Sequence, residues 1–286
     1  MEQTRNPATE AARKVRYFPR EHGATAMLLT PIVCAAVLAR TWRWSELATL
    51  TAAFSSLAAK DPLVALYRQQ FVWKQRRAGW DAAASWFAGW AFVFGTSGLV
   101  LLWAWPWRAL VGMGAALAAY SALAVAVNVK NRQRSVLFQI ASAAALSSSA
   151  QACAISATGT IPQWCWWLWA LLSLHATVGI LVVHARLDAR IALRAAAAVE
   201  RARQSRSTAM IALGVLVCAA ISALIAGRVW IALALGVGVL GYGSDLLSQQ
   251  NPEALQMPLM KVGRRALSLS LLFATLVVVG LAHGAR

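Results

Sequence analysis

Lys and Arg alternate between the two sides of a series of apolar segments, and this alternation restricts the fold more than any single motif does. The chain has nine apolar segments, and the ten segments around them hold 5, 2, 5, 1, 3, 0, 6, 1, 3 and 1 basic residues in order. Of the 27 basic residues, 22 therefore fall on one side. Because short loops rich in Lys and Arg stay in the cytoplasm, the pattern predicts about nine transmembrane helices with the N-terminus inside.

The apolar character of the chain excludes a soluble domain. Hydrophobic residues make up 59% of the 286 positions and charged residues only 13%, which is far from the balance of a soluble protein. Most apolar segments approach the roughly 20 residues that cross a hydrocarbon core. We therefore expect an all-α, polytopic membrane protein. Its spans are predicted at residues 24–39, 44–66, 83–104, 107–127, 136–157, 163–184, 207–226, 229–247 and 267–283.

The connections between the expected spans are of two kinds. Those on the predicted outer side are very short, such as Trp105 and Pro106, whereas those on the inner side are longer, such as residues 185–206. Short turns make consecutive helices pack as antiparallel hairpins, so the variable loops and the function are expected on the cytoplasmic side. The sequence predicts a single transmembrane helical domain at residues 23–286. A basic cytoplasmic segment at residues 1–22 is expected before it, without a removable signal peptide.

The charge and the cysteines exclude further classes of protein. The net charge is +17, but the basic residues lie in short loops and form no stripe or patch, so we expect no nucleic-acid partner. Anionic lipid headgroups are the natural partners of such loops, and the oligomeric state stays open. Cys34, Cys153, Cys165 and Cys218 form no Cys-x-x-Cys pair, which argues against a zinc site. Reduced cysteines that pack between helices are favoured over a Cys153–Cys165 disulfide.

A short polar motif precedes the first expected span. Arg20, Glu21 and His22 are adjacent and lie between Pro19 and Gly23. Proline can open a helix and a carboxylate suits the first helical turn, so these residues could anchor the span at the interface. An anchor, however, needs only one of the three polar groups. A functional role for all three is the alternative interpretation.

This motif carries a resemblance to a known family. The run from Pro19 to Ala24, followed by Ala26-Met27-Leu28-Leu29-Thr30-Pro31, resembles the opening signature of YwiC-like membrane proteins, which have Trp where this chain has Thr25. Residues 132–135 also resemble the family, although its Asn-Glu pair appears here as Phe138-Gln139. The resemblance implies a multi-pass protein of the bacterial inner (plasma) membrane.

Polar residues also mark the inner ends of the second and sixth expected spans. Nine spans with polar residues at these two places are similar to the layout of UbiA-type intramembrane prenyltransferases. That resemblance implies a UbiA-like bundle in which acidic motifs hold Mg²⁺ against a prenyl diphosphate. A hard cation on a diphosphate needs several carboxylates, and each place here offers one Asp, so we predict no metal site. The polar residues are Lys60, Asp61 and Arg68 for the second span, and His184, Arg186 and Asp188 for the sixth.

The leading hypothesis is a cavity that opens to the cytoplasm and binds or modifies an anionic-headed lipid or isoprenoid. Basic side chains at its rim would neutralise the head without a metal ion. Whether the protein is an enzyme stays open, and in the alternative interpretation these charges simply pair with one another. The predicted binding residues are Arg20, Lys60, Arg68, Arg134, Gln139, His175 and Arg186. The predicted catalytic residues are Glu21 or Asp61 as base and His22 or His184 as proton shuttle, with Asp188 close by.

A second hypothesis places a polar pathway inside the membrane. His175 lies near the middle of the sixth expected span, where an ionisable side chain is costly. Gln139, Ser142 and Ser149 share one face of the fifth expected span, with Gln151 further along. These residues would line the pathway of a secondary transporter or exporter. In the alternative interpretation, His175 forms a hydrogen bond to a facing Ser or backbone carbonyl. The sequence contains no Walker box or dinucleotide-binding glycine pattern, and it identifies no cofactor.

Overall fold

The computed structural model describes residues 22–76, 79–129 and 135–284, and all secondary structure in these ranges is helical. The all-α fold class is therefore confirmed. Seven helical segments of the described residues are long and apolar enough to cross a membrane. Their number and length indicate a multi-pass membrane protein. They are α4 (Trp80–Ala104), α5 (Trp107–Val129), α6 and α7 taken together (Val136–Thr158), α8 (Gln163–Ala192), α9 (Val199–Ile225), α10 (Val229–Ser248) and α12 (Leu259–Gly284).

The remaining two expected spans also form helices. Helix α2 (His22–Ala39) is apolar but has only 18 residues, and Pro31 lies inside it. Helix α3 (Trp44–Tyr67) has 24 residues and is long enough to cross a bilayer. Its lower hydropathy comes from the Ser and Thr residues within it and from the charged residues near its two ends. Every expected span thus corresponds to a helix.

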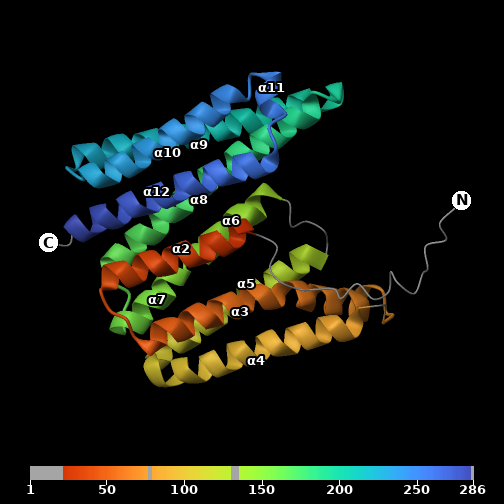
Figure 1. Cartoon of the computed structure of the whole chain (residues 1–286), viewed down its shortest axis with the longest axis vertical. Coiled ribbons are helices and arrows are strands. Elements are labelled where there is room, and N and C mark those ends of the chain that lie inside the picture. Colours follow the sequence, from red (N-terminus) through yellow and green to blue (C-terminus); the bar gives the residue numbers. More distant parts are fainter. Residues whose placement is uncertain (1–21, 77–78, 130–134, 285–286) are drawn as a thin grey trace, which may run out of the picture.

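The helices run side by side in three groups, with their connections at two ends of the bundle (Figure 1). Helices α3 and α4 pack against each other on one side, and α8, α9, α10 and α12 form the opposite side. Helices α2, α6 and α7 lie between these groups, and α2 packs on α7. This middle group therefore joins the two sides of the molecule.

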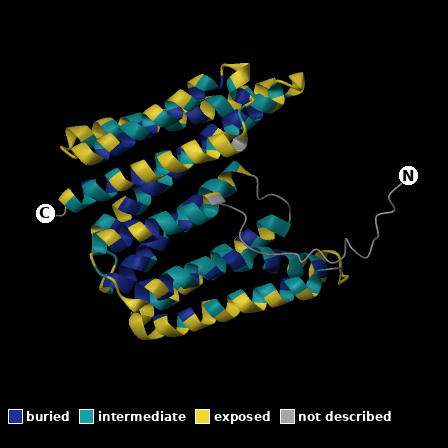
Figure 2. Ribbon diagram, in the orientation of Figure 1, coloured by how far each residue is buried: buried dark blue, intermediate teal, exposed yellow. Residues whose placement is uncertain are grey.

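Burial follows the same division. The larger core joins α2, α7, α8, α9, α10 and α12, and it is built on the fully buried Leu168, Leu216, Leu235 and Phe273. A smaller core joins α3, α4 and α7 around Ala48. Figure 2 shows the buried positions facing the interior and the exposed positions along the outward faces of the helices. Many of the exposed residues are large and apolar, as lipid contact requires.

The fifth expected span is present but broken. Helix α6 (Val136–Ser147) ends one residue before α7 (Ser149–Thr158), and Ser148 forms a turn between them. The break faces the proline of α2, because the Ser149 hydroxyl donates a hydrogen bond of 2.9 Å to the Leu28 carbonyl. Pro31 supplies no N–H to the Met27 carbonyl four residues earlier, and the Ser149 contact is made to the next carbonyl of the same turn.

Short elements complete the end of the bundle where α3 finishes. A π-helix, η1 (Arg68–Val72), continues α3, and a 3₁₀ helix, η2 (Ala196–Ala198), joins α8 to α9. The four-residue helix α11 (Pro252–Leu255) lies between α10 and α12. The connections at the opposite end are much shorter, as expected. We call the first end the basic end, because the Lys-rich and Arg-rich connections lie there.

Candidate functional site

The last part of α3 and the turn that follows it carry three of the predicted residues, and two of them are in contact. Lys60 Nζ lies 3.9 Å from Asp61 Oδ1, and Asp61 is the more exposed of the two side chains. Pro62 follows inside the helix, which continues to Tyr67. Arg68 then begins the π-helix and donates a hydrogen bond to the Asn128 carbonyl near the end of α5. The site thus connects α3 to α5 at the basic end.

The π-helix is an unusual feature of this site. Its geometry is closed by the Trp73 N–H, which donates a hydrogen bond of 2.8 Å to the Arg68 carbonyl five residues earlier. Gln69 is buried, whereas the Phe71 side chain is 63% exposed. Single π-helical turns are rare and occur frequently at functional sites. No sequence pattern indicated this turn, although Arg68 within it was predicted as a binding residue.

Aromatic and basic side chains are interspersed over residues 67–76, which include the π-helix. Tyr67, Phe71 and Trp73 are exposed large residues, and Lys74 comes next. The Arg76 guanidinium then lies 4.9 Å from the centroid of the Trp80 ring, which is within the range of a cation–π interaction. Such a mixture is typical of the membrane–water interface, where aromatic rings and basic groups meet lipid headgroups. We call residues 67–76 the interfacial segment.

A shallow, open groove of about 360 Å³ lies on the surface of the first half of α4, the helix that follows this segment. Gly89 leaves the middle of the groove open, since a side chain there would meet no heavy atom within 4 Å. The Trp90 ring packs edge-on against Phe54 of α3 at a centroid distance of 5.8 Å. The groove is therefore supported from behind by α3. Its lining residues are Ser85, Trp86, Gly89, Trp90 and Val93.

The predicted residues of α8 attach this helix to its neighbours. His184 Nε2 lies 3.0 Å from Gln139 Oε1 of α6, which joins two predicted residues. Asp188 is buried and forms an ion pair of 3.1 Å with Arg201 of α9, and it also accepts a hydrogen bond from the Ser205 hydroxyl. These contacts fix the positions of α6 and α9 relative to α8.

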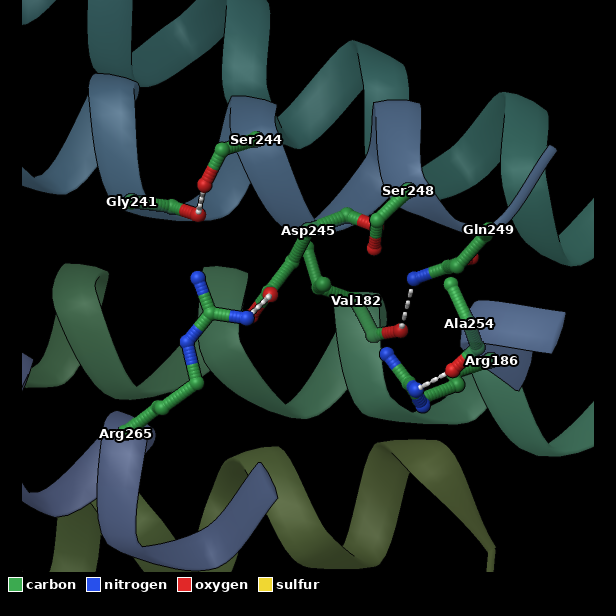
Figure 3. Close-up of polar contacts among 9 residues, drawn as sticks. All are labelled: Val182, Arg186, Gly241, Ser244, Asp245, Ser248, Gln249, Ala254 and Arg265. Carbon is green, nitrogen blue, oxygen red and sulfur yellow. Dashed lines mark hydrogen bonds and ion pairs between the residues drawn. The ribbon is translucent and has the colours of Figure 1, made fainter. Parts of the chain in front are cut away.

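Arg186 holds the segment around α11 (Figure 3). Its side chain is buried and donates a hydrogen bond to the Ala254 carbonyl, while its Nε has no hydrogen-bond partner among the described residues. One turn further, Arg190 donates to the carbonyls of Leu255 and Met257. Cations are favourable at the carbonyl end of a helix. The two arginines therefore bind carbonyls at the end of α11 and just beyond it, which is a role that the sequence did not predict.

A second ion pair and a buried amide lie beside Arg186. Gln249 donates a hydrogen bond of 3.3 Å to the Val182 carbonyl of α8, and Asp245 of α10 pairs with Arg265 of α12 at 3.8 Å. Figure 3 shows the Asp245 carboxylate directed toward Arg265. The contacts of Arg186 thus lie in a network that connects α8, α10, α11 and α12. The predicted anion-binding role of Arg186 stays a prediction.

His175 is enclosed between α8, α10 and α12. Its Nε2 lies 3.0 Å from both Ser270 Oγ and the Tyr242 hydroxyl oxygen, and its ring stacks on Phe273 at a centroid distance of 4.2 Å. Gly179 makes room for this arrangement, because an added Cβ would lie 2.8 Å from the Tyr242 hydroxyl oxygen. The contact with Ser270 is the kind of interhelical hydrogen bond that the structural interpretation of His175 requires.

Comparison with known proteins identifies the first half of the chain. Residues 18–154 match the family model of YwiC-like proteins. Over that segment, the chain is similar to YwiC-like proteins. No curated protein and no solved structure matches the chain. The UbiA-like layout therefore remains a prediction.

The YwiC-like segment extends from before α2 into α7. It therefore includes the Lys60–Asp61 pair, Arg68, the interfacial segment and the groove of α4, whereas His184, Arg186 and Asp188 lie beyond it. Of the other predicted residues, Arg20, Glu21 and Arg134 lie outside the described residues. His22 begins α2, but its side chain lies outside the described part. The α3 site is thus the part of the prediction that the family segment contains.

The donor set does not fit the magnesium–diphosphate site that a UbiA-like layout implies. Among the described residues, no three His, Cys, Asp or Glu side chains are grouped closely enough to hold a metal ion. Asp61 pairs with Lys60, and Asp188 pairs with Arg201. Each of the two places supplies one carboxylate, while a hard cation on a diphosphate needs several.

The four cysteines are free thiols.

Proposed function

We propose that this protein lies in the inner membrane with its N-terminus and basic end in the cytoplasm, and binds an anionic-headed lipid or isoprenoid beside α3 and α4. The observation that carries the proposal is the position of the α4 groove directly after the interfacial segment. An amphiphile needs a basic site for its head and an apolar groove for its tail. The chain offers the two in succession, with the basic segment immediately before α4.

The head would meet the basic side chains of the interfacial segment. A Lys or Arg near an anionic surface contributes on the order of 1 kcal/mol of attraction. Arg68 adds a planar guanidinium, which can donate two parallel hydrogen bonds to a phosphate. Lys60 lies about two helical turns before Arg68 and pairs with Asp61. Asp61 is the carboxylate of this site that is placed to accept a proton, should the bound lipid be modified.

The tail would lie in the groove of α4. Its walls are the rings of Trp86 and Trp90, whose centroids are 6.4 Å apart. The Trp90 indole N–H is buried and has no hydrogen-bond partner among the described residues. Because this nitrogen is inaccessible from the surface, the tail would contact only the apolar faces of the two rings.

Lipid binding is tested with the purified full-length protein. Native mass spectrometry with added phosphatidylglycerol and phosphatidylcholine should show preference for the anionic lipid. Arg68→Ala should weaken phosphatidylglycerol binding about tenfold, since a hydrogen bond to a charged group contributes roughly 1.5–3 kcal/mol. Gly89→Leu should weaken both lipids by filling the groove. The proposal is contradicted if the wild type binds the two lipids equally. It is also contradicted if Arg68→Ala binds phosphatidylglycerol as tightly as the wild type does.

Two control variants separate the site from general effects. Gly95→Leu introduces the same side chain at another exposed glycine of α4 that does not line the groove. Arg108→Ala removes an exposed arginine at the opposite end of the bundle. Both should bind the two lipids as the wild type does. If Gly95→Leu loses as much binding as Gly89→Leu, the groove is not the tail site.

A second function is favoured by the broken helix. The α6–α7 break at Ser148 meets the proline-containing helix α2, and discontinuous helices near the midplane are common in secondary transporters. Gln151 on α7 is buried, and its Oε1 has no hydrogen-bond partner among the described residues. If the protein is a transporter, proteoliposomes that contain the wild type should show proton-coupled flux. The rate of this flux should fall in Gln151→Leu and in His175→Ala. Absence of flux in the wild type would exclude this function.

A further inference from the structure

A buried polar network lies at the end of the bundle opposite the basic end. Ser45 Oγ donates a hydrogen bond of 2.8 Å to the Ser156 carbonyl, and Thr49 Oγ1 donates one of 2.9 Å to the Ser45 carbonyl. The Thr49 and Ser156 hydroxyls are also hydrogen-bonded to each other. The Trp105 indole N–H lies 2.6 Å from Ser156 Oγ. The network therefore joins the start of α3, the end of α4 and α7.

The donors of this network are fully used. An indole N–H can only donate, so Ser156 Oγ accepts from Trp105, and it is the donor to Thr49 when the Thr49 proton is used on the Ser45 carbonyl. Thr49 in turn donates to the Ser45 carbonyl, and Ser45 donates to the Ser156 carbonyl. Each hydroxyl has one proton. None of these groups therefore has a proton left for a further acceptor.

Glu46 lies between Ser45 and Thr49 on α3, and one of its two carboxylate oxygens has no partner among the described residues. Its side chain is buried, with 6% of the residue exposed. Thr41 Oγ1 donates a hydrogen bond of 2.7 Å to Glu46 Oε1, whereas Oε2 has no hydrogen-bond partner among the described residues. No ion pair joins Glu46 to a Lys or Arg of the described ranges. Arg40 and Arg43 of the adjoining connection are exposed.

The environment of Glu46 compensates only part of a negative charge. The residue lies in the first turn of α3, where the helix dipole favours a carboxylate. A buried charge without a partner nevertheless costs several kcal/mol, and buried carboxylates are therefore paired or bind cations. The one described hydrogen-bond partner of Glu46 is the neutral hydroxyl of Thr41, and Thr49 of the network lies three residues further along α3, on the same side of the helix. One carboxylate among neutral oxygens balances a single positive charge, while a divalent ion commonly takes more carboxylates.

We propose that Glu46 is the anionic ligand of a monovalent metal ion of the sodium type, bound at Oε2. Thr41 Oγ1 is a further oxygen of the site, because its hydrogen bond to Oε1 places it beside the carboxylate. The site lies at the predicted outer end, so the ion enters from that face. This site is separate from the lipid site at the basic end of α3, and neither proposal depends on the other.

Thermal unfolding of the purified full-length protein tests the cation site. The Tm is measured in NaCl and in choline chloride at the same ionic strength. Binding to the folded state alone should raise the Tm of the wild type in NaCl by about 3 °C. Glu46→Gln keeps the shape of the side chain and should lose this difference. Glu253→Gln, which changes an exposed carboxylate on α11, should retain it.

Each outcome bears on the proposal. An equal Tm of the wild type in the two salts overturns it, and so does a sodium effect that persists in Glu46→Gln. A Tm that depends on pH but not on sodium also overturns it, because the site would then take a proton and no metal ion. If Glu46→Gln does not fold, binding of radioactive sodium to the wild type decides. Saturable binding supports the site, and its absence refutes it.

Discussion

Replacing Arg190 with Met should release the α11 segment from α8. Arg190 donates hydrogen bonds to two carbonyls of this segment, those of Leu255 and Met257. Each hydrogen bond from a charged donor contributes roughly 1.5–3 kcal/mol, so the loss of both lowers the local opening free energy by about 3 kcal/mol. Met retains most of the aliphatic packing of the arginine stem. The free energy of global unfolding should change less than the local opening free energy.

Hydrogen exchange measured by mass spectrometry reports this local opening. The amides of Leu255, Gln256 and Met257 are hydrogen-bonded within the segment, so their exchange is protected in the wild type. A loss of about 3 kcal/mol corresponds to roughly a hundredfold faster exchange, because 1.4 kcal/mol is a factor of ten. Arg194→Met, at an exposed position two residues beyond the end of α8, should leave the exchange unchanged.

The result also decides what the arginines of α8 do. If exchange in the α11 segment is the same in Arg190→Met and the wild type, the contacts with the carbonyls do not hold the segment, and the reasoning is refuted. Arg190 and Arg186 would then be available to an anionic ligand, as the sequence predicted for Arg186. If exchange accelerates as expected, these arginines belong to the structure of the basic end. The lipid site is then confined to α3 and α4.

Three further predictions concern buried polar contacts. His175→Ala should lower the free energy of unfolding by about 3 kcal/mol, because it removes the ring that stacks on Phe273 and leaves a cavity. Lipid binding of this variant, measured by native mass spectrometry, should not change. Ser149→Ala should cost about 1–3 kcal/mol in denaturant unfolding, because the buried Leu28 carbonyl loses its side-chain donor. Trp105→Phe should lower the Tm by a few degrees, because it keeps an aromatic ring but removes one hydrogen bond of about 1 kcal/mol. An unchanged stability in any of these variants would show that the contact concerned contributes nothing.

The positions of the spans were predictable because the bilayer imposes them. An apolar run of about 20 residues has few alternatives to a membrane helix, and each expected run is helical in the structure. The ends were less predictable. Helix α9 begins at Val199, whereas the span was expected from residue 207. Hydropathy marks only the part of a helix inside the hydrocarbon, and the polar residues before it continue the same helix in the headgroup region.

The partners of polar residues were much harder to predict. Asp188 pairs with Arg201 on the next helix. The sequence offered several other basic residues on the predicted inner side as possible partners and did not distinguish among them. The π-helical turn at Arg68 and the break at Ser148 depend on how helices pack, and a single sequence records packing only indirectly. Glu46 was not singled out because a carboxylate in the first turn of a helix is ordinary. Its burial and its unpartnered oxygen appear only in three dimensions.

The length of α8 has a consequence for how the protein can be reached from water. A helix of 30 residues is about 45 Å long, whereas a hydrocarbon core is about 30 Å thick. Unless α8 is strongly tilted, roughly a third of it therefore projects beyond the core. Its last turns, with the Asp188–Arg201 pair and α11, form an ordered platform outside the lipid. An antibody or a soluble protein that approaches this end would meet a folded epitope and not a set of loose loops.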